Sequence, residues 1–155
     1  MKQVHLVPNR CMGCEECLEA CSKAHDWEAR AYVEMVDGYF PFPMRCNHCH
    51  DAPCRAACPT DAIKLSAGGA VVVDRPKCIG CGTCSIVCPF GVPFVSAQTG
   101  KIVKCDLCDE RVAGGEKPVC VESCPKGALE FGPREEPLAG RRQQLARHAK
   151  TALWP

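Results

Sequence analysis

The chain has 155 residues, and 16 of them are cysteines, a share that points to a scaffold built on thiols rather than to an average globular protein. The formal net charge of +1 gives no reason to expect nucleic acid as a partner, and no stretch approaches the roughly 18 apolar residues of a membrane span. Because the chain has only 5 Phe, 2 Trp and 2 Tyr, we expect a thin hydrocarbon core.

Short strands and helices are expected between the cysteines, in an α+β fold. In chain order the pattern predicts a strand at residues 4–7, a helix over 15–25, a hairpin of strands at 63–65 and 70–74, a loop over 109–119, and a strand at 128–131. The N-terminal residues lack the apolar segment of a secretory signal, so we expect a cytoplasmic protein.

The last predicted segment, residues 134–155, reads as a basic amphipathic helix. Its apolar side chains fall on one helical stripe, formed by Leu138, Leu145, Ala149 and Leu153. We expect this tail to dock onto a larger partner. The alternatives are a helix folded back onto its own body and a helix bound to a membrane surface.

The 16 cysteines form four runs of four, with none left over. The runs are Cys11, Cys14, Cys17, Cys21; Cys46, Cys49, Cys54, Cys58; Cys78, Cys81, Cys84, Cys88; and Cys105, Cys108, Cys120, Cys124. The third run has the Cys-x2-Cys-x2-Cys-x3-Cys-Pro spacing of bacterial [4Fe-4S] ferredoxins, and the others are variants of it.

The spacing also predicts which cysteines share a cluster. Three thiolates separated by short steps can wrap three corners of one cube, and the fourth cysteine ligates the neighbouring cube. We number the resulting ligand sets 1 to 4 and use these names throughout. They are Cys11, Cys14, Cys17 and Cys124 (set 1); Cys105, Cys108, Cys120 and Cys21 (set 2); Cys46, Cys49, Cys54 and Cys88 (set 3); and Cys78, Cys81, Cys84 and Cys58 (set 4).

Three other uses of cysteine fit the sequence less well than four [4Fe-4S] clusters. A disulfide framework needs an oxidising compartment, for which no export signal is present. Zinc sites use separated Cys-x2-Cys pairs rather than runs of four. Thioredoxin-like chemistry uses one Cys-x-x-Cys pair on a βαβ unit, which the pattern does not predict.

The pairing of the runs implies two ferredoxin-like units, one inserted within the other. Runs two and three pair within residues 46–97, the inserted two-cluster unit. Runs one and four must then pair with each other, which makes residues 1–45 and 98–133 the outer two-cluster unit.

The motifs resemble those of the four-cluster, ferredoxin-type electron-transfer subunits of molybdenum and tungsten oxidoreductases, hydrogenases and carbon monoxide dehydrogenases. The matching motifs are Cys11-Met-Gly-Cys14, Cys46-Asn-His-Cys49, Cys78-Ile-Gly-Cys81-Gly-Thr-Cys84, Cys88-Pro-Phe-Gly-Val-Pro93, Lys104-Cys105-Asp-Leu-Cys108 and Cys124-Pro-Lys-Gly-Ala-Leu129. The resemblance covers residues 1 to 132 and implies the same nested pairing. It also implies a larger catalytic partner, such as a tungsten or molybdenum aldehyde or formate oxidoreductase, and a flavin subunit as a second redox partner.

The predicted function is therefore the transfer of single electrons between a catalytic subunit and another redox partner, with no catalytic residue in this chain. A free, diffusible polyferredoxin and a cluster-based redox sensor are the alternatives. Copies that stack end to end would extend the series of clusters, so self-association is also expected. Because ligation has to replace hydrocarbon in the core, the iron-free chain is expected to be largely unfolded.

A cation precedes the first cysteine of every run, at Arg10, Arg45, Lys77 and Lys104. These cations either offset the negative charge of the clusters and set their potentials, or only solubilise the surface. His48 and His50 flank Cys49, and since every run already has four thiols, we expect them to be surface groups or groups behind the ligands. The positions of His5, His25 and His148 in the sequence indicate even less about a role than those of His48 and His50.

Overall fold

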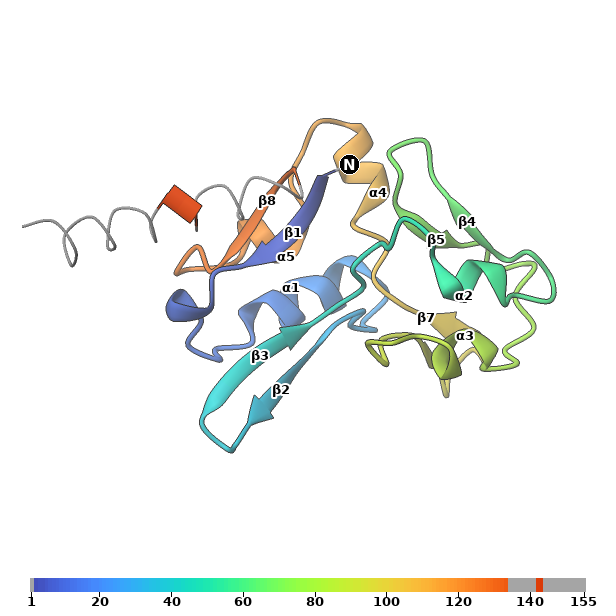
Figure 1. The fold of residues 1–155 in the computed structure, drawn as a ribbon, viewed down its shortest axis with the longest axis horizontal. Coiled ribbons are helices and arrows are strands. Elements are labelled where there is room, and N and C mark those ends of the chain that lie inside the picture. The colour runs from blue at the N-terminus through green and yellow to red at the C-terminus, as the bar shows by residue number, and fades with distance from the viewer. Residues whose placement is uncertain (1, 134–141, 144–155) are drawn as a thin grey trace, which may run out of the picture.

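The computed structural model describes residues 2–133 and 142–143 and shows short helices set among two-stranded antiparallel sheets (Figure 1). The elements are β1 (Lys2–Leu6), η1 (a 3-10 helix, Pro8–Arg10), α1 (Glu16–Ala24), β2 (Tyr32–Val36), β3 (Phe40–Met44), α2 (Pro53–Ala56), β4 (Ile63–Leu65), β5 (Val71–Val73), α3 (Thr83–Ile86), β6 (Phe94–Val95), β7 (Ile102–Val103), α4 (Asp109–Ala113), α5 (Val119–Glu122) and β8 (Leu129–Pro133). This mixture agrees with the predicted α+β class.

The first and last strands of this region pair with each other. β1 and β8 are antiparallel, with Lys2 opposite Pro133 and Leu6 opposite Leu129. The Val7 N–H extends the pairing with a 2.8 Å hydrogen bond to the Ala128 carbonyl, and α1 packs against α5 beside the sheet (Figure 1). The strands expected at 4–7 and 128–131 and the helix expected at 15–25 are confirmed, with boundaries that differ by one or two residues.

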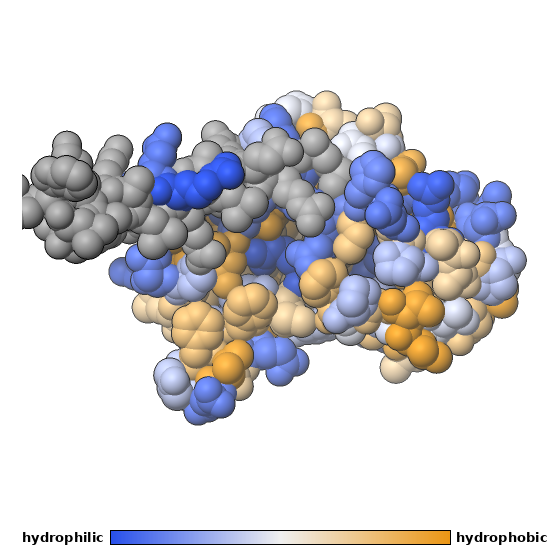
Figure 2. All heavy atoms as spheres, in the orientation of Figure 1, coloured by the Kyte–Doolittle hydropathy of each residue, from blue (hydrophilic) through white to orange (hydrophobic). Residues whose placement is uncertain are grey.

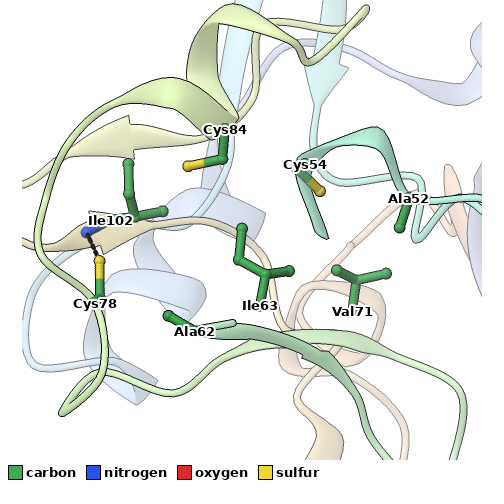
Figure 3. Packing of buried hydrophobic residues seen from close by; sticks show 8 residues of the cluster. All are labelled: Ala52, Cys54, Ala62, Ile63, Val71, Cys78, Cys84 and Ile102. Atoms are coloured by element: carbon green, nitrogen blue, oxygen red, sulfur yellow. Dashed lines mark hydrogen bonds between the residues drawn. The ribbon is translucent and has the colours of Figure 1, made fainter. Parts of the chain in front are cut away.

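The middle of the chain folds around the hairpin of β4 and β5. β4 and β5 are antiparallel with Ile63 opposite Val73, as predicted from the turn at Gly68 and Gly69. The buried cluster beside this hairpin contains three thiols and five hydrocarbon side chains (Figure 3), and its members are Ala52, Cys54, Ala62, Ile63, Val71, Cys78, Cys84 and Ile102. Ile102 lies in this core although the predicted boundary at residue 97 assigns it to the outer unit.

The parts of the fold that were not expected include the antiparallel pair of β6 and β7, the β2–β3 hairpin and α4. The hairpin of β2 and β3 projects from the body at the lower edge of Figure 1, and Met35, Tyr39 and Phe42 are exposed on it. Figure 2 shows orange and blue side chains mixed over this part of the surface. The loop expected over 109–119 begins as α4 instead. Asp109 and Glu110 stabilise its first turn through the helix dipole, and Gly114 and Gly115 end it.

The predicted tail helix at 134–155 lies outside the described residues except for positions 142 and 143. Within the part of the chain that the structure describes, no helix is both long enough and apolar enough to cross a bilayer.

Candidate metal centre

Three of the four predicted ligand sets each line a separate cavity. The thiols of set 4 surround one cavity together with Ile63, Val73 and Ile102. The thiols of set 1 surround a second cavity, between the loop of the first run and the segment that leads into β8. The thiols of set 2 share a third cavity with Cys17 of set 1. In each cavity the fourth thiol comes from a different run, as the exchange rule requires.

For set 3 the indication is electrostatic and concerns Cys46, Cys54 and Cys88. Burial raises the pKa of Cys54, the nearby Lys104 ammonium lowers it, and the thiols of Cys46 and Cys88 both raise it. Cys46 and Cys54 come from the second run, whereas Cys88 ends the third run. The structure therefore brings Cys88 to the second run rather than leaving it only with its own.

A repeated backbone turn aims N–H groups at the first cysteine of the runs. The residue two positions after that cysteine has a positive φ in every run: Gly13 (72°), His48 (45°), Gly80 (70°) and Leu107 (65°). In the last three runs its N–H lies 3.4 Å from the sulfur of Cys46, Cys78 or Cys105. Such donors stabilise the negative charge of a metal-bound thiolate.

Other backbone N–H groups lie close to the sulfur of the last cysteine in two of the runs. The Ala62 N–H lies 3.3 Å from the Cys58 sulfur, and the Ala128 N–H lies 3.2 Å from the Cys124 sulfur. In both cases the donor is four residues after the cysteine, beyond the proline that follows it. The spacing of the runs therefore fixes hydrogen bonds to the thiols as well as the positions of the thiols.

Several of these thiols are held in the protonated form when no metal is bound. Burial raises the pKa of Cys84 to about 11 and that of Cys120 to about 12, and it also raises the pKa of Cys105. A thiolate at these positions therefore requires a positive partner at neutral pH. A metal ion supplies that charge and displaces the proton.

Of the two expected environments, burial excludes the surface for His48, whereas His50 is almost fully exposed. The His48 Nδ1 accepts a 2.9 Å hydrogen bond from the Val71 N–H. Burial lowers the pKa of His48 to about 3, with a smaller contribution from the Lys104 charge, so the ring is neutral and its proton lies on Nε2. Among the described residues this buried Nε2 has no hydrogen-bond partner.

These observations test whether the residues fit [4Fe-4S] clusters, and they do. The donors are thiols in groups of four, the backbone directs N–H groups at them, and an orphaned N–H of His48 lies one residue from Cys49 in set 3. Cluster sulfides and ligating thiolates accept hydrogen bonds from donors of this kind.

The four cations that precede the runs occupy different environments. Arg10 is on the surface, where its guanidinium contacts Glu130 at 2.8 Å, and Lys77 is exposed. Arg45 is partly buried, and its charge lowers the pKa of Cys17 and of Cys120 against the larger effect of burial. Lys104 is only 3% exposed. The sequence places these cations at equivalent positions, but the structure buries them to different degrees.

A second group of ligand-type side chains adjoins set 2. One donor atom from each of His25, Asp106 and Cys108 lies within 4.8 Å of the other two. Asp106 also forms an ion pair with Arg30, whose backbone N–H lies 3.4 Å from the Cys21 sulfur. Because Cys108 and Cys21 both line the set 2 cavity, we assign this group to the surroundings of set 2. No pattern in the sequence pointed to His25.

Comparison with known proteins gives matches over most of the chain. The 4Fe-4S dicluster domain family matches residues 36–134. The probable anaerobic dimethyl sulfoxide reductase chain YnfG of Escherichia coli is 41% identical over 147 residues, which cover 83% of this chain and 71% of the relative. The thiosulfate reductase electron transfer subunit PhsB of Salmonella typhi is 37% identical over 94% of this chain and 86% of its own length.

Solved structures with similar folds include the active site complex BamBC of benzoyl coenzyme A reductase with bound benzoyl-CoA. The similarity covers 95% of this chain and 90% of that chain, with a TM-score of 0.47 and 22% sequence identity.

Proposed function

Because the chain belongs to the 4Fe-4S dicluster domain family, we propose that it holds four [4Fe-4S] clusters and serves as the electron-transfer subunit of an oxidoreductase complex. The observation that carries the proposal is the grouping of the thiols of sets 1, 2 and 4 around separate cavities, each completed by a cysteine from another run. A bound [4Fe-4S] cluster supplies reversible one-electron chemistry. The protein holds the ligands, donates N–H groups to their sulfurs and places cations nearby.

The assignment of ligands to sets 1 to 4 is part of this proposal. For sets 1, 2 and 4 it is supported by the cavities, and for set 3 by the mutual influence of Cys46, Cys54 and Cys88. The nested arrangement of two ferredoxin-like units is supported by the pairing of β1 with β8 around the β4–β5 hairpin. Because Ile102 packs with Cys78 and Cys84, we extend the inserted unit from residue 97 to residue 103.

The proposal places catalysis on a larger partner subunit. The relatives are named as subunits of dimethyl sulfoxide and thiosulfate reductases. These reductases therefore join the tungsten and molybdenum aldehyde and formate oxidoreductases expected from the resemblance as candidate partners. A flavin subunit as the second redox partner, end-to-end self-association and a cytoplasmic location stay predictions. Mass spectrometry of what co-purifies with the native complex identifies the partners.

The first test is the metal content of the chain. Elemental analysis should find 16 iron atoms per chain, four for each of four clusters, and EPR spin quantitation of the reduced protein should account for four paramagnetic centres. Zinc in place of iron, or far fewer irons, would contradict the proposal.

A second test asks which cysteines share a cluster. The variant Cys88→Ser should lose one cluster and expose the other three thiols of set 3, which belong to the second run. The rival assignment, in which each run holds its own cluster, predicts exposure of Cys78, Cys81 and Cys84 instead. Anaerobic alkylation followed by peptide mass spectrometry distinguishes the two assignments. The variant Cys58→Ser is the matched control, because it should expose the third-run thiols of set 4.

A further inference from the structure

Lys104 is a buried cation at the place where the two units meet. It follows β7 directly and precedes Cys105, the first ligand of set 2, yet only 3% of the residue is exposed. Lys77 occupies the equivalent position before Cys78 and is exposed. Burying a charged ammonium is unfavourable unless it gains partners, so the contacts of Lys104 need an explanation.

The ammonium of Lys104 has an acceptor for each of its three N–H groups. It donates to the carbonyl of Val71 in β5 and, at 2.8 Å, to the carbonyl of Cys105. The third acceptor is the sulfur of Cys46, 3.7 Å from Nζ. These three contacts fix the position of the charge, unlike that of a surface lysine that moves in solvent.

The three acceptors come from both units. Val71 and Cys46 belong to the inserted unit, and Cys46 is a ligand of set 3. Cys105 belongs to the outer unit and is a ligand of set 2. Within the described residues no ion pair joins the Lys104 ammonium to a carboxylate. Its charge instead lies against the Cys46 sulfur of set 3 and the backbone carbonyl of Cys105, a ligand of set 2.

The charge has a predictable effect on redox chemistry. When one electron enters a [4Fe-4S] site, its charge falls by one and no bond to the protein forms or breaks. A positive charge fixed against a ligating sulfur favours the reduced form, and burial protects this interaction from screening by solvent and salt. Lys77 is exposed, so solvent and salt screen its charge.

We propose that Lys104 is a positioning residue that raises the reduction potentials of the clusters held by sets 2 and 3, and so favours the passage of electrons across the junction between the two units. This inference rests on the proposed function, because it concerns the clusters that the chain is proposed to hold. Among the described residues no hydrogen bond joins the ammonium to a ligand of set 1 or set 4, so we expect the clusters of these sets to be affected less.

The decisive variant is Lys104→Gln, compared with Lys77→Gln as the matched control. The glutamine amide still offers two N–H donors, from a side chain one bond shorter, and removes the charge. We expect the ratio of reduced to oxidised cluster in sets 2 and 3 to fall at least tenfold at a fixed ambient potential, which corresponds to a shift of about 59 mV for one electron. Lys104→Arg should retain potentials close to those of the unsubstituted protein, and Lys77→Gln should leave all four unchanged.

The measurement is an EPR-monitored redox titration of the full chain in its native complex, with dithionite as the reductant. The Cys88→Ser variant, which should lack the set 3 cluster, identifies the signal of that cluster by difference. Unchanged potentials in Lys104→Gln with 16 irons bound would overturn the inference, and so would loss of clusters from this variant, since that would give Lys104 a structural role. Fewer than four clusters in the unsubstituted protein would instead refute the proposed function.

Discussion

Replacing Gly80 by alanine should remove the set 4 cluster while leaving the other three in place. Gly80 has a φ of +70°, and a Cβ built there would lie 2.0 Å from the carbonyl oxygen of Gly100. The segment that carries this oxygen cannot move freely, because Lys101 donates to the carbonyl of Cys78 and the Ile102 N–H lies 3.5 Å from the Cys78 sulfur. The added methyl group would therefore push β7 away from a ligand.

The expected loss in the free energy of unfolding is the sum of two contributions. The left-handed backbone costs a residue with a Cβ about 1–2 kcal/mol, and forcing an extra carbon into a packed site costs about 1–3 kcal/mol more. Gly82 supplies the control, since its φ is +75° but no atom lies within 4 Å of the place that an added methyl group would take. Gly82→Ala should therefore show only the first term, a loss of about 1–2 kcal/mol.

The assay is iron content after anaerobic reconstitution, combined with thermal melting followed by the visible absorbance of the clusters. Gly80→Ala should bind about 12 irons rather than 16, because each cluster contains four. Gly82→Ala should bind all 16 and melt only a few degrees below the unsubstituted protein. Equal iron content and equal melting temperatures in the two variants would refute the steric argument.

Three further predictions concern the rest of the molecule. Removing iron by chelation under reducing conditions should abolish most of the far-ultraviolet circular dichroism, since Cys54, Cys78 and Cys84 are part of the central core, and a native-like spectrum would contradict this. Replacing Arg10 by alanine should change the free energy of unfolding by less than about 1 kcal/mol, because its ion pair with Glu130 is half exposed on both sides; a larger loss in denaturant titration would refute this. Deleting residues 134–155 should dissociate the enzyme complex on gel filtration, and an intact complex would exclude the docking role.

The cysteine spacing predicted much of the fold because it is a local constraint with a fixed geometric meaning. A run of closely spaced thiols dictates a tight loop followed by a helical turn, and the Gly68–Gly69 turn dictates the hairpin of β4 and β5. The β2–β3 hairpin carries no comparable signal, because Pro41 and Pro43 interrupt its second strand and argue against a strand in a sheet.

Burial was the property that the sequence could not predict. Lys77 and Lys104 both precede the first cysteine of a run, but only Lys104 lies where chain segments from the two units converge, beside Val71 and Cys46. His48 is buried for a related reason, since its Nδ1 accepts a hydrogen bond from the backbone of β5, 23 residues further along the chain. Such environments depend on contacts between distant segments, which local spacing does not encode.

The pairing of β1 with β8 also sets an order for biosynthesis. The β4–β5 hairpin joins residues about ten positions apart and can close as soon as it leaves the ribosome, whereas β1 must wait for a partner that is translated more than 120 residues later. Until then the nascent chain carries the thiols of its first run, including the exposed Cys14, without the strand that completes their side of the molecule. Maturation in air would leave these early cysteines open to oxidation for longest, so we expect the outer clusters to be the ones most often lost during aerobic expression.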